Sequence, residues 1–179
     1  MTSKQIFDRG INGKSNFLQN FVDVLCERNT PFCIIGGLAV NAYATPLYSE
    51  DLDVVVAVDK LNEIIPVLEK KFKVKKYTFG MNVSQKGSKL RIQITWDKRY
   101  QEFIKRAVRK NVFGYNLPVA SIKDIFQGKI WAASDTDRRP DKRLKDLADI
   151  ARLTKVKPSL LSGLPEKLKK QIYPRKRNQ

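Results

Sequence analysis

The sequence predicts an α+β fold, in which a mixed, twisted β-sheet is flanked by helices and followed by a helical C-terminal part. Short apolar runs bounded by turn residues, such as Phe32–Ile35, indicate buried strands. Apolar residues at helical spacing form stripes between these runs. From residue 121 onward the patterns are helical. We therefore expect an α/β core over residues 1–120, and a helical part over residues 121–179 that packs on the core and ends in a basic tail.

Each element of the N-terminal half is predicted from its own pattern. Ser15 can cap a first helix that runs to residue 28, where Thr30-Pro31 ends it. Asp59 can cap a later helix that carries an apolar stripe, although Pro66 lies inside this helix and could kink it. Between the two helices the patterns predict a strand at Phe32–Ile35, a short helix over 38–44 and an apolar strand that begins at residue 51.

The second half is predicted in the same way. Ser121 can cap one helix and Pro140 can open another, because proline suits the first turn of a helix. The predicted elements, in order, are paired strands over 74–80 and 89–96 joined through a turn at 85–88, a basic amphipathic helix over 99–110, a short strand over 117–120, and helices over 121–133 and 140–153.

Two glycines and two aspartates form the motif with the most chemical content. Gly36-Gly37 follows a buried strand and opens a helix, so its backbone N–H groups are exposed to a ligand such as phosphate. After thirteen intervening residues, Asp51 and Asp53 flank Leu52 in a strand, and the period of two places both carboxylates on one face. Carboxylates that close repel each other unless a cation lies between them, and oxygen ligands suit Mg²⁺. The motif therefore predicts a site for a metal-bound triphosphate.

Charge is the second strong signal. The chain of 179 residues has a formal net charge of +17, distributed in blocks. Residues 69–110 and 138–179 are strongly basic, whereas residues 1–68, which contain the proposed carboxylate site, are net acidic. Basic blocks of this kind attract polyanions, so a nucleic acid such as tRNA or another RNA is the expected partner. A lysine-rich surface that serves only solubility is the alternative.

The composition also excludes several classes of protein. The chain contains no histidine, which excludes a Ser-His-Asp triad and leaves carboxylates, lysines or metal-bound groups to move protons. Cys26 and Cys33 have no metal-ligand spacing and are expected to be small core residues. The sequence shows no apolar run of membrane-spanning length and no signal peptide, so we expect a cytoplasmic protein without a membrane partner.

At the glycine and aspartate motif, the segment GGLAVNAYATPLYSEDLDVVV resembles the signature of the DNA polymerase β-like nucleotidyltransferase superfamily. The later layout, with Lys129 and Arg143-Leu144-Lys145-Asp146 in a helical region, is similar to the abortive-infection type II toxins and the MenT-like nucleotidyltransferases. This resemblance implies a nucleotidyltransferase core that binds Mg²⁺ through Asp51 and Asp53 and transfers a nucleoside monophosphate from a nucleoside triphosphate to an acceptor hydroxyl.

The resemblance also implies roles for further residues. Gly36, Gly37 and the backbone of Leu38 would bind the phosphates, together with Lys129. Asp146 would act as a base or orient the acceptor, and a cognate antitoxin could exist. Asp146 and its neighbour Asp149 could instead form surface ion pairs with little energetic weight.

The chain departs from the superfamily pattern at two places. The position of a third carboxylate corresponds to Gln93, a neutral amide; Asp97 could replace it only if the register of the strand differs. The segment Pro46-Leu47-Tyr48-Ser49 lacks the arginine that often precedes the aspartates. The sequence therefore leaves two functions open: an active enzyme that modifies RNA, a protein or a small molecule such as an aminoglycoside, or a catalytically impaired protein that binds nucleic acid or a partner.

Overall fold

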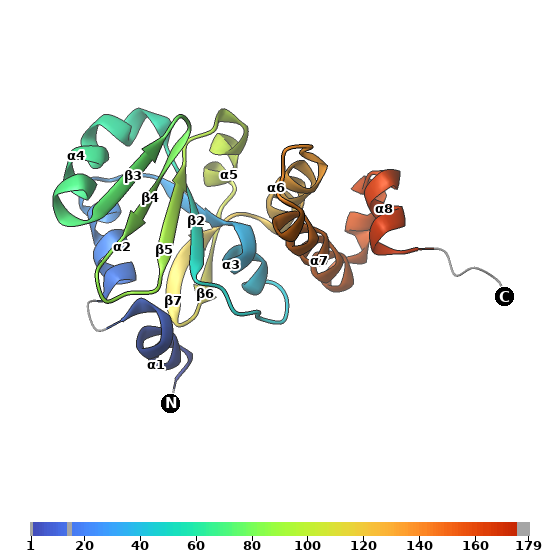
Figure 1. The fold of residues 1–179 in the computed structure, drawn as a ribbon, viewed down its shortest axis with the longest axis horizontal. Helices are drawn as coiled ribbons and strands as arrows, with labels where there is room; N and C mark the ends of the chain where they lie inside the picture. Colours follow the sequence, from blue (N-terminus) through green and yellow to red (C-terminus); the bar gives the residue numbers. More distant parts are fainter. Residues whose placement is uncertain (1, 14–15, 175–179) are drawn as a thin grey trace.

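The computed structural model describes residues 2–13 and 16–174, and a seven-stranded sheet forms its centre (Figure 1). The strand order is β3-β4-β5-β2-β1-β7-β6. The pairs β1/β7 and β2/β5 are parallel, while β1/β2, β3/β4, β4/β5 and β6/β7 are antiparallel. The strands are β1 Phe32–Ile35, β2 Asp51–Val56, β3 Lys73–Tyr77, β4 Gly80–Ser84, β5 Arg91–Thr95, β6 Val108–Val112 and β7 Tyr115–Val119. The sheet is thus mixed, which confirms the predicted α+β class.

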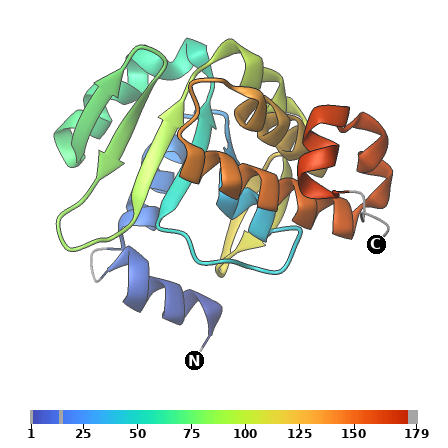
Figure 2. The ribbon, with the colours of Figure 1, turned by 45° about the vertical axis from the view of Figure 1, so that its right-hand side comes forward.

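Helices cover the two faces of this sheet unequally. On one face α2 and α4 pack against each other; on the other, α3 contacts β1 and β2, and α6 and α7 pack on α3 (Figures 1 and 2). The α-helices are α1 Ser3–Phe7, α2 Phe17–Glu27, α3 Gly36–Asn41, α4 Leu61–Lys71, α5 Gln101–Lys105, α6 Ile122–Ser134, α7 Pro140–Val156 and α8 Glu166–Ile172. Short 3-10 helices lie at Val58–Lys60, Lys98–Tyr100 and Pro158–Gly163.

The hydrophobic core follows from the alternation along the strands and the stripes along the helices. On β2, Leu52 and Val54 are fully buried, and on α2 Phe17 and Phe21 are fully buried as well. Burial of large apolar side chains contributes about 1.5–3 kcal/mol each. The same alternation turns Asp51 and Asp53 to the opposite face, towards α3 and α7.

The N-terminal residues form an anchored segment that the sequence patterns did not indicate. A turn of π-helix at Asp8–Asn12 follows α1. The Tyr115 hydroxyl donates a hydrogen bond to Asp8 Oδ1 at 2.7 Å, and Asn12 Nδ2 donates to the Tyr115 oxygen at 3.1 Å. The Ile11 carbonyl accepts hydrogen bonds from the backbone N–H groups of Lys89 and Leu90. The segment is therefore tied to β7 and to the start of β5.

Two predicted elements are wrong because two tight hairpins were missed. The strand predicted at 74–80 pairs with β4 and not with β5, since the chain turns at Thr78-Phe79. The helix predicted over 99–110 ends at Lys105, and β6 follows it. The β6–β7 turn places Phe113 at φ 51° and Gly114 at φ 86°. Phenylalanine seldom adopts this left-handed conformation, so the turn has no ordinary sequence signature.

The predicted caps have mixed outcomes. The Ser121 side chain accepts a hydrogen bond from the Asp124 N–H, and Pro140 opens α7, as predicted. Asp59 is not a cap, because it lies inside the 3-10 helix that precedes α4. Ser15 lies outside the described residues. Helix α3 begins at Gly36, two residues earlier than predicted, and Pro66 lies inside α4.

The two cysteines differ in burial. Cys33 is buried in the core, and burial of its thiol raises its pKa to about 12. Cys26 is exposed, so the prediction of two core cysteines is wrong for this one. Within residues 2–13 and 16–174, none of the helices combines the length and the apolar character needed to span a membrane.

Candidate functional site

Asp51 and Asp53 lie together in a cavity of about 190 Å³ at the edge of β2. The register pairs Asp53 with Gln93 and Asp51 with Arg91 on the parallel strand β5. Gln93 and the backbone turn at Gly37 line the same cavity. The structure therefore brings the glycine turn, both aspartates and the amide at the third-carboxylate position to one place.

Gly36 is required by its conformation and by its distance from Asp53. Its φ of 69° lies in the left-handed region. A Cβ atom on this residue would lie 1.9 Å from Asp53 Oδ2, so the carboxylate packs directly on the backbone. Gly37 has no atom within 4 Å of the corresponding position. Among the residues that the structure describes, no side chain caps the first turn of α3, whose N–H groups include that of Leu38; the Leu38 side chain itself is buried.

Gly36→Ala is expected to destabilise the fold by about 1–3 kcal/mol and to displace Asp53, because both backbone strain and steric overlap oppose the new methyl group. Gly37→Ala is the matched control: it adds the same methyl group one residue later into open space. Urea denaturation and Mg²⁺ binding of both variants test this. Equal behaviour of the two variants would contradict the close packing of Gly36 on Asp53.

The two carboxylates have different partners. Asp51 Oδ1 accepts a hydrogen bond from Arg91 Nε at 2.8 Å, and Asp51 Oδ2 lies 3.5 Å from Lys142 Nζ. Asp53 has no hydrogen bond or ion pair to another described side chain. Burial raises the pKa of Asp53 to about 6, an effect that the charge of Asp51 increases and that Lys129 partly offsets. A cation bound at Asp53 would supply the missing compensation.

The donor atoms fit a small, hard cation. Within the described parts of the chain, no group of three or more His, Cys, Asp or Glu side chains surrounds a common metal position. Two carboxylates and the Gln93 amide are available instead. Mg²⁺ is commonly held by one or two carboxylates, with water and substrate phosphates as its other ligands. The residues present therefore fit Mg²⁺.

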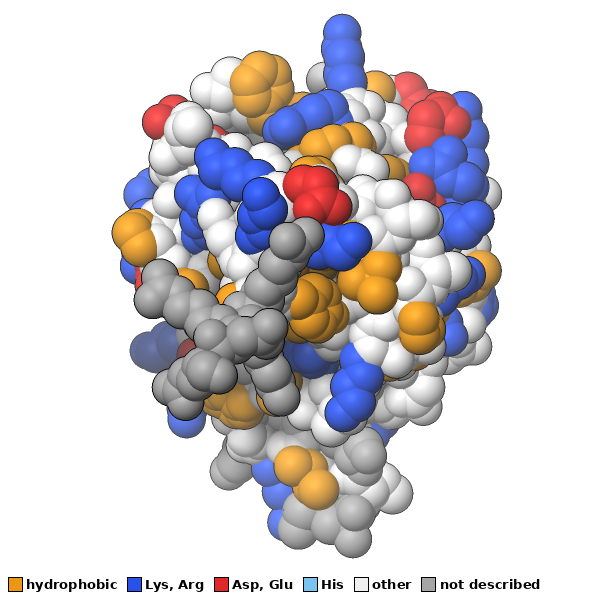
Figure 3. Space-filling model, turned by 90° about the vertical axis from the view of Figure 1, so that its right-hand side faces the viewer, with side chains coloured by type: hydrophobic (Ala, Val, Ile, Leu, Met, Phe, Trp, Pro, Cys, Tyr) orange, Lys and Arg blue, Asp and Glu red, His pale blue; other side chains and the backbone are white. Residues whose placement is uncertain are grey.

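A cationic wall, formed by Arg138 just before α7 and by Lys142 and Lys145 on α7, faces the aspartates across the cavity. Figure 3 views the molecule from the side of the C-terminal helices and shows Lys and Arg side chains spread over this face. Sequence reasoning assigned no role to these three residues, although Lys142 and Lys145, three residues apart on α7, lie on one side of that helix. They supply cations where the segment at 46–49 lacks an arginine.

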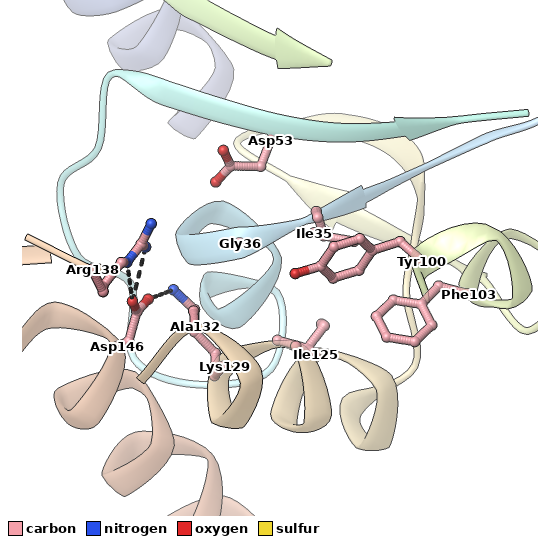
Figure 4. Close-up of a pocket in the computed structure, with 11 residues that line it drawn as sticks. Ile35, Gly36, Asp53, Tyr100, Phe103, Ile125, Lys129, Ala132, Arg138 and Asp146 are labelled. Atoms are coloured by element: carbon pink, nitrogen blue, oxygen red, sulfur yellow. Dashed lines mark hydrogen bonds and ion pairs between the residues drawn. The ribbon is translucent and has the colours of Figure 1, made fainter. Parts of the chain in front are cut away.

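A buried ion cluster lies next to this wall and lines the same cavity. Lys129 Nζ, on α6, lies 2.8 Å from Asp146 Oδ1 of α7 (Figure 4). It also lies 2.7 Å from Oδ2 of Asp149, on the same helix. Arg138 contacts the other oxygen of Asp146 at 2.8 Å, and Arg152 contacts Asp149 at 2.7 Å. Burial alone would lower the pKa of Lys129, but Asp149 and Asp146 outweigh it and raise that pKa. The two aspartates are thus buried, and the alternative of surface pairs is wrong.

This arrangement bears on two predicted roles. Both oxygens of Asp146 accept contacts from cations, which favours a positioning role for this residue over that of a free base. Lys129 lines both cavities next to Asp53. Any contact with a phosphate would be made while its ammonium group is also paired with the carboxylates of the ion cluster. The nucleotide contacts of Lys129 and the catalytic role of Asp146 stay predictions.

A second cavity, of about 170 Å³, adjoins Asp53 on its other side. Tyr100, Phe103 and Ile125 form its wall, and the Tyr100 hydroxyl points into it (Figure 4). Burial raises the pKa of Tyr100, so its phenol stays neutral and can donate a hydrogen bond. Asp97 lines neither cavity; its carboxylate accepts hydrogen bonds from the backbone and guanidinium of Arg99. The structure therefore places Gln93, and not Asp97, beside the aspartates.

Solved structures share this fold at low sequence identity. ANT(2")-Ia in complex with adenylyl-2"-tobramycin is 16% identical with a TM-score of 0.61, covering 87% of this chain and 97% of its own. The lincosamide antibiotic adenylyltransferase LnuA, bound to lincomycin, is 12% identical with a TM-score of 0.54, covering 76% and 96%. An antigenic nucleotidyltransferase-like protein from Paracoccidioides brasiliensis is 16% identical with a TM-score of 0.51, covering 86% and 93%.

Sequence comparison gives a more specific result. No curated protein sequence matches the chain. The family described as "Nucleotidyl transferase AbiEii toxin, Type IV TA system" matches residues 27–176, which include the glycine turn, both aspartates, Lys129 and the ion cluster on α7. The match extends over most of the chain and agrees with the nucleotidyltransferase fold. The chain therefore belongs to the AbiEii family of nucleotidyl transferase toxins.

Proposed function

We propose that the protein is a Mg²⁺-dependent enzyme that transfers a nucleoside monophosphate from a nucleoside triphosphate to a hydroxyl group of RNA, such as a tRNA. In this proposal the protein acts in the cytoplasm, as a toxin countered by a cognate antitoxin. One observation carries the enzymatic part of this proposal. Asp51 and Asp53 share a cavity with the Gly37 backbone and with the cationic wall of Arg138, Lys142 and Lys145. Carboxylates opposite cations form a binding site for a metal-bound polyphosphate.

The two adjoining cavities suggest how a nucleotide is held. Gly37 and the cationic wall would bind the triphosphate, and the nucleoside would lie against Tyr100 and Phe103 in the second cavity. When bound at Asp51 and Asp53, Mg²⁺ neutralises charge on the phosphoryl oxygens. The acceptor oxygen then forms a bond to the α-phosphorus while the bond to the bridging oxygen breaks. Pyrophosphate leaves, and the hydroxyl proton passes to water or to a carboxylate.

The charge of the protein favours RNA as the acceptor. Two of the structures with this fold are bound to adenylyl-2"-tobramycin and to lincomycin, so related folds accept small molecules. An aminoglycoside is a polycation, and this chain has a net charge of +17. Repulsion between like charges disfavours that acceptor, whereas a polyanion is attracted.

Incubation of the protein with each radiolabelled nucleoside triphosphate, Mg²⁺ and total tRNA tests the proposal directly. Label should appear on RNA and should disappear with Asp51→Ala. Parallel reactions with tobramycin, and with the protein as its own acceptor, identify the other acceptor classes. Absence of Asp51-dependent label on every acceptor would contradict an enzyme. Mg²⁺ and nucleotide affinities that Asp51→Ala leaves unchanged would then favour a catalytically impaired binding protein.

Gln93→Glu is expected to raise the affinity for Mg²⁺ roughly tenfold, because it adds a third negative charge directly opposite Asp53 in the register. Isothermal titration with Mg²⁺ measures this change. Asn82→Asp is the matched control, since it adds the same charge one strand further from Asp53 and should have a smaller effect. An equal gain in both variants would mean that Gln93 does not face the metal position.

A further inference from the structure

Half of the sheet has an open polar face that begins at the aspartates. On β4 and β5, alternate side chains such as Val83 and Ile92 are fully buried, while Asn82 and Gln93 on the other face stay partly exposed. Helix α3 covers β1 and β2, and α6 and α7 pack on α3, so the helices on this side lie over the β1–β2 half of the sheet (Figure 2). We call the residues of this face the open sheet face: Lys73, Lys75 and Tyr77 of β3, Gly80, Asn82 and Ser84 of β4, and Arg91, Gln93 and Thr95 of β5.

The register turns this face into a continuous path from the site to the edge of the sheet. Asp53 is opposite Gln93, Gln93 is opposite Asn82, and Asn82 is opposite Lys75. Side chains of directly opposed residues point to the same face. Three strand spacings separate Asp53 from Lys75, roughly 14 Å. A groove of about 290 Å³ along this path is lined by Asp53, Gln93, Asn82, Thr95, Tyr77 and Phe79.

Two aromatic side chains border the far end of the groove. Phe79 is 66% exposed and Tyr77 is 50% exposed. The backbone that carries Phe79 is fixed, because its carbonyl accepts hydrogen bonds from Trp96 N at 3.1 Å and from Thr95 Oγ1 at 3.2 Å. The next residue, Gly80, packs so closely that a Cβ atom would lie 2.4 Å from the Ile94 carbonyl oxygen. A fixed hairpin therefore presents exposed rings beside a polar groove.

The edge strand adds positive charge with little local compensation. Lys76, on the other face of β3, is paired with Glu69 at 2.7 Å. Lys73 and Lys75 have no carboxylate partner among the described residues, and Lys75 Nζ lies 5.5 Å from the centre of the Tyr77 ring. Exposed rings next to unpaired lysines suit unpaired bases and their phosphates, because bases stack on aromatic faces and phosphates bind cations. The same lysines repel a cationic ligand.

We propose that the open sheet face binds the single-stranded end of a nucleic-acid acceptor, with the terminal hydroxyl at Asp53, the preceding bases on Phe79 and Tyr77, and the phosphates on Lys73 and Lys75. The path accommodates roughly two to four nucleotides, because duplex spacing is about 3.4 Å per nucleotide and an extended strand is longer. A duplex cannot offer its bases to the rings. This inference rests on the proposed function and assigns its acceptor path.

Fluorescence anisotropy with a labelled 12-nucleotide single-stranded RNA tests the path. Tyr77→Ala with Phe79→Ala is expected to weaken binding at least tenfold. Lys73→Ala with Lys75→Ala is expected to weaken binding. It should also reduce the slope of log K against log salt concentration by an amount that corresponds to between one and two released counterions. The matched control, Lys86→Ala with Lys89→Ala, removes the same charge from the exposed β4–β5 loop and should have a smaller effect. Binding of the same 12-nucleotide sequence is also measured as single-stranded DNA and as a duplex. These two probes show whether affinity depends on the ribose and on the single-stranded form.

Nucleotide binding separates failure of this inference from failure of the proposed function. All three double variants should bind a fluorescent ATP analogue with Mg²⁺ as the unchanged protein does. Unchanged RNA binding in both open-face variants, or binding of the duplex as tight as that of the single strand, would overturn the path and leave the transferase intact. Nucleotide binding that is insensitive to Asp51→Ala and Asp53→Asn would instead overturn the proposed function.

Discussion

Asp53→Asn is expected to lower the rate of nucleotidyl transfer roughly 1,000-fold, equivalent to about 4 kcal/mol of transition-state stabilisation. Asp53 packs on Gly36, lines both cavities and has no hydrogen-bond or ion-pair partner among the described side chains, so it is the carboxylate most available to a metal ion. Asparagine keeps the shape of the side chain and removes its charge. Single-turnover assays with saturating nucleotide and acceptor measure the effect on the chemical step.

The same substitution is expected to stabilise the metal-free protein at high pH. Burial raises the pKa of Asp53 from 3.8 to about 6, so the folded protein binds this proton more tightly than the unfolded chain does. The free energy of unfolding therefore falls as the pH rises from about 4 to about 6, and the loss is complete above that range. Asparagine avoids this loss, which amounts to at most about 3 kcal/mol.

Urea denaturation in EDTA at pH 4 and at pH 8 tests this second effect. The gain from Asp53→Asn should appear at pH 8 and be absent at pH 4. Asp97→Asn is a suitable comparison for both assays, because Asp97 lies outside the two cavities and asparagine also serves as a helix cap. A gain of equal size at both pH values would show that the ionisation of Asp53 is not the cause. Loss of transfer with Asp97→Asn would show that this carboxylate contributes to the site.

Lys129→Met is expected to lower the free energy of unfolding by about 3–5 kcal/mol. The substitution keeps most of the volume of the side chain but removes the cation that Asp146 and Asp149 share. Asp146 is only 1% exposed, so water cannot replace the lost partner. Urea denaturation at pH 7 measures the change.

Lys123→Met provides the control on the same helix, because Lys123 is exposed and its loss should change stability by less than about 0.5 kcal/mol. Adding Asp149→Asn to Lys129→Met should recover part of the loss, because only one carboxylate, Asp146, then lacks its contact with Lys129. If Lys129→Met were no more destabilising than Lys123→Met, the ion cluster would not hold α6 and α7 together.

The part of the fold around the glycine turn could be predicted because its signals are local. A buried strand, two adjacent glycines and carboxylates at a period of two each specify structure over a few residues. The hairpins could not be predicted in this way. Phe113 occupies a left-handed position that usually selects glycine or asparagine, and the charged strand Val108–Val112 resembles the continuation of a basic helix.

The same holds for the site: its residues on the strands near the motif could be predicted, and its residues from distant parts of the chain could not. The resemblance and the strand pattern assigned Gln93 to the third-carboxylate position, and the structure adds that Gln93 lies opposite Asp53. The cationic wall was missed because Arg138 and Lys142 lie more than 80 residues after the aspartates in the chain, Arg138 just before α7 and Lys142 on it. Only tertiary packing brings these residues to the cavity. Patterns in a single sequence do not show which residues far apart in the chain come into contact.

The anchored N-terminal segment shows that the start of the family match and the start of the folded unit are different positions in the chain. Family similarity begins at residue 27, after Phe17 and Phe21 of α2, which fill the core, and after the segment tied to Tyr115. A fragment cut at residue 27, where the family match begins, would expose the apolar underside of the sheet and lose the N-terminal segment that connects β7 to the start of β5. The smallest part of the chain that folds is therefore longer than the part that matches the family. Truncated variants should keep the N-terminal segment and α2.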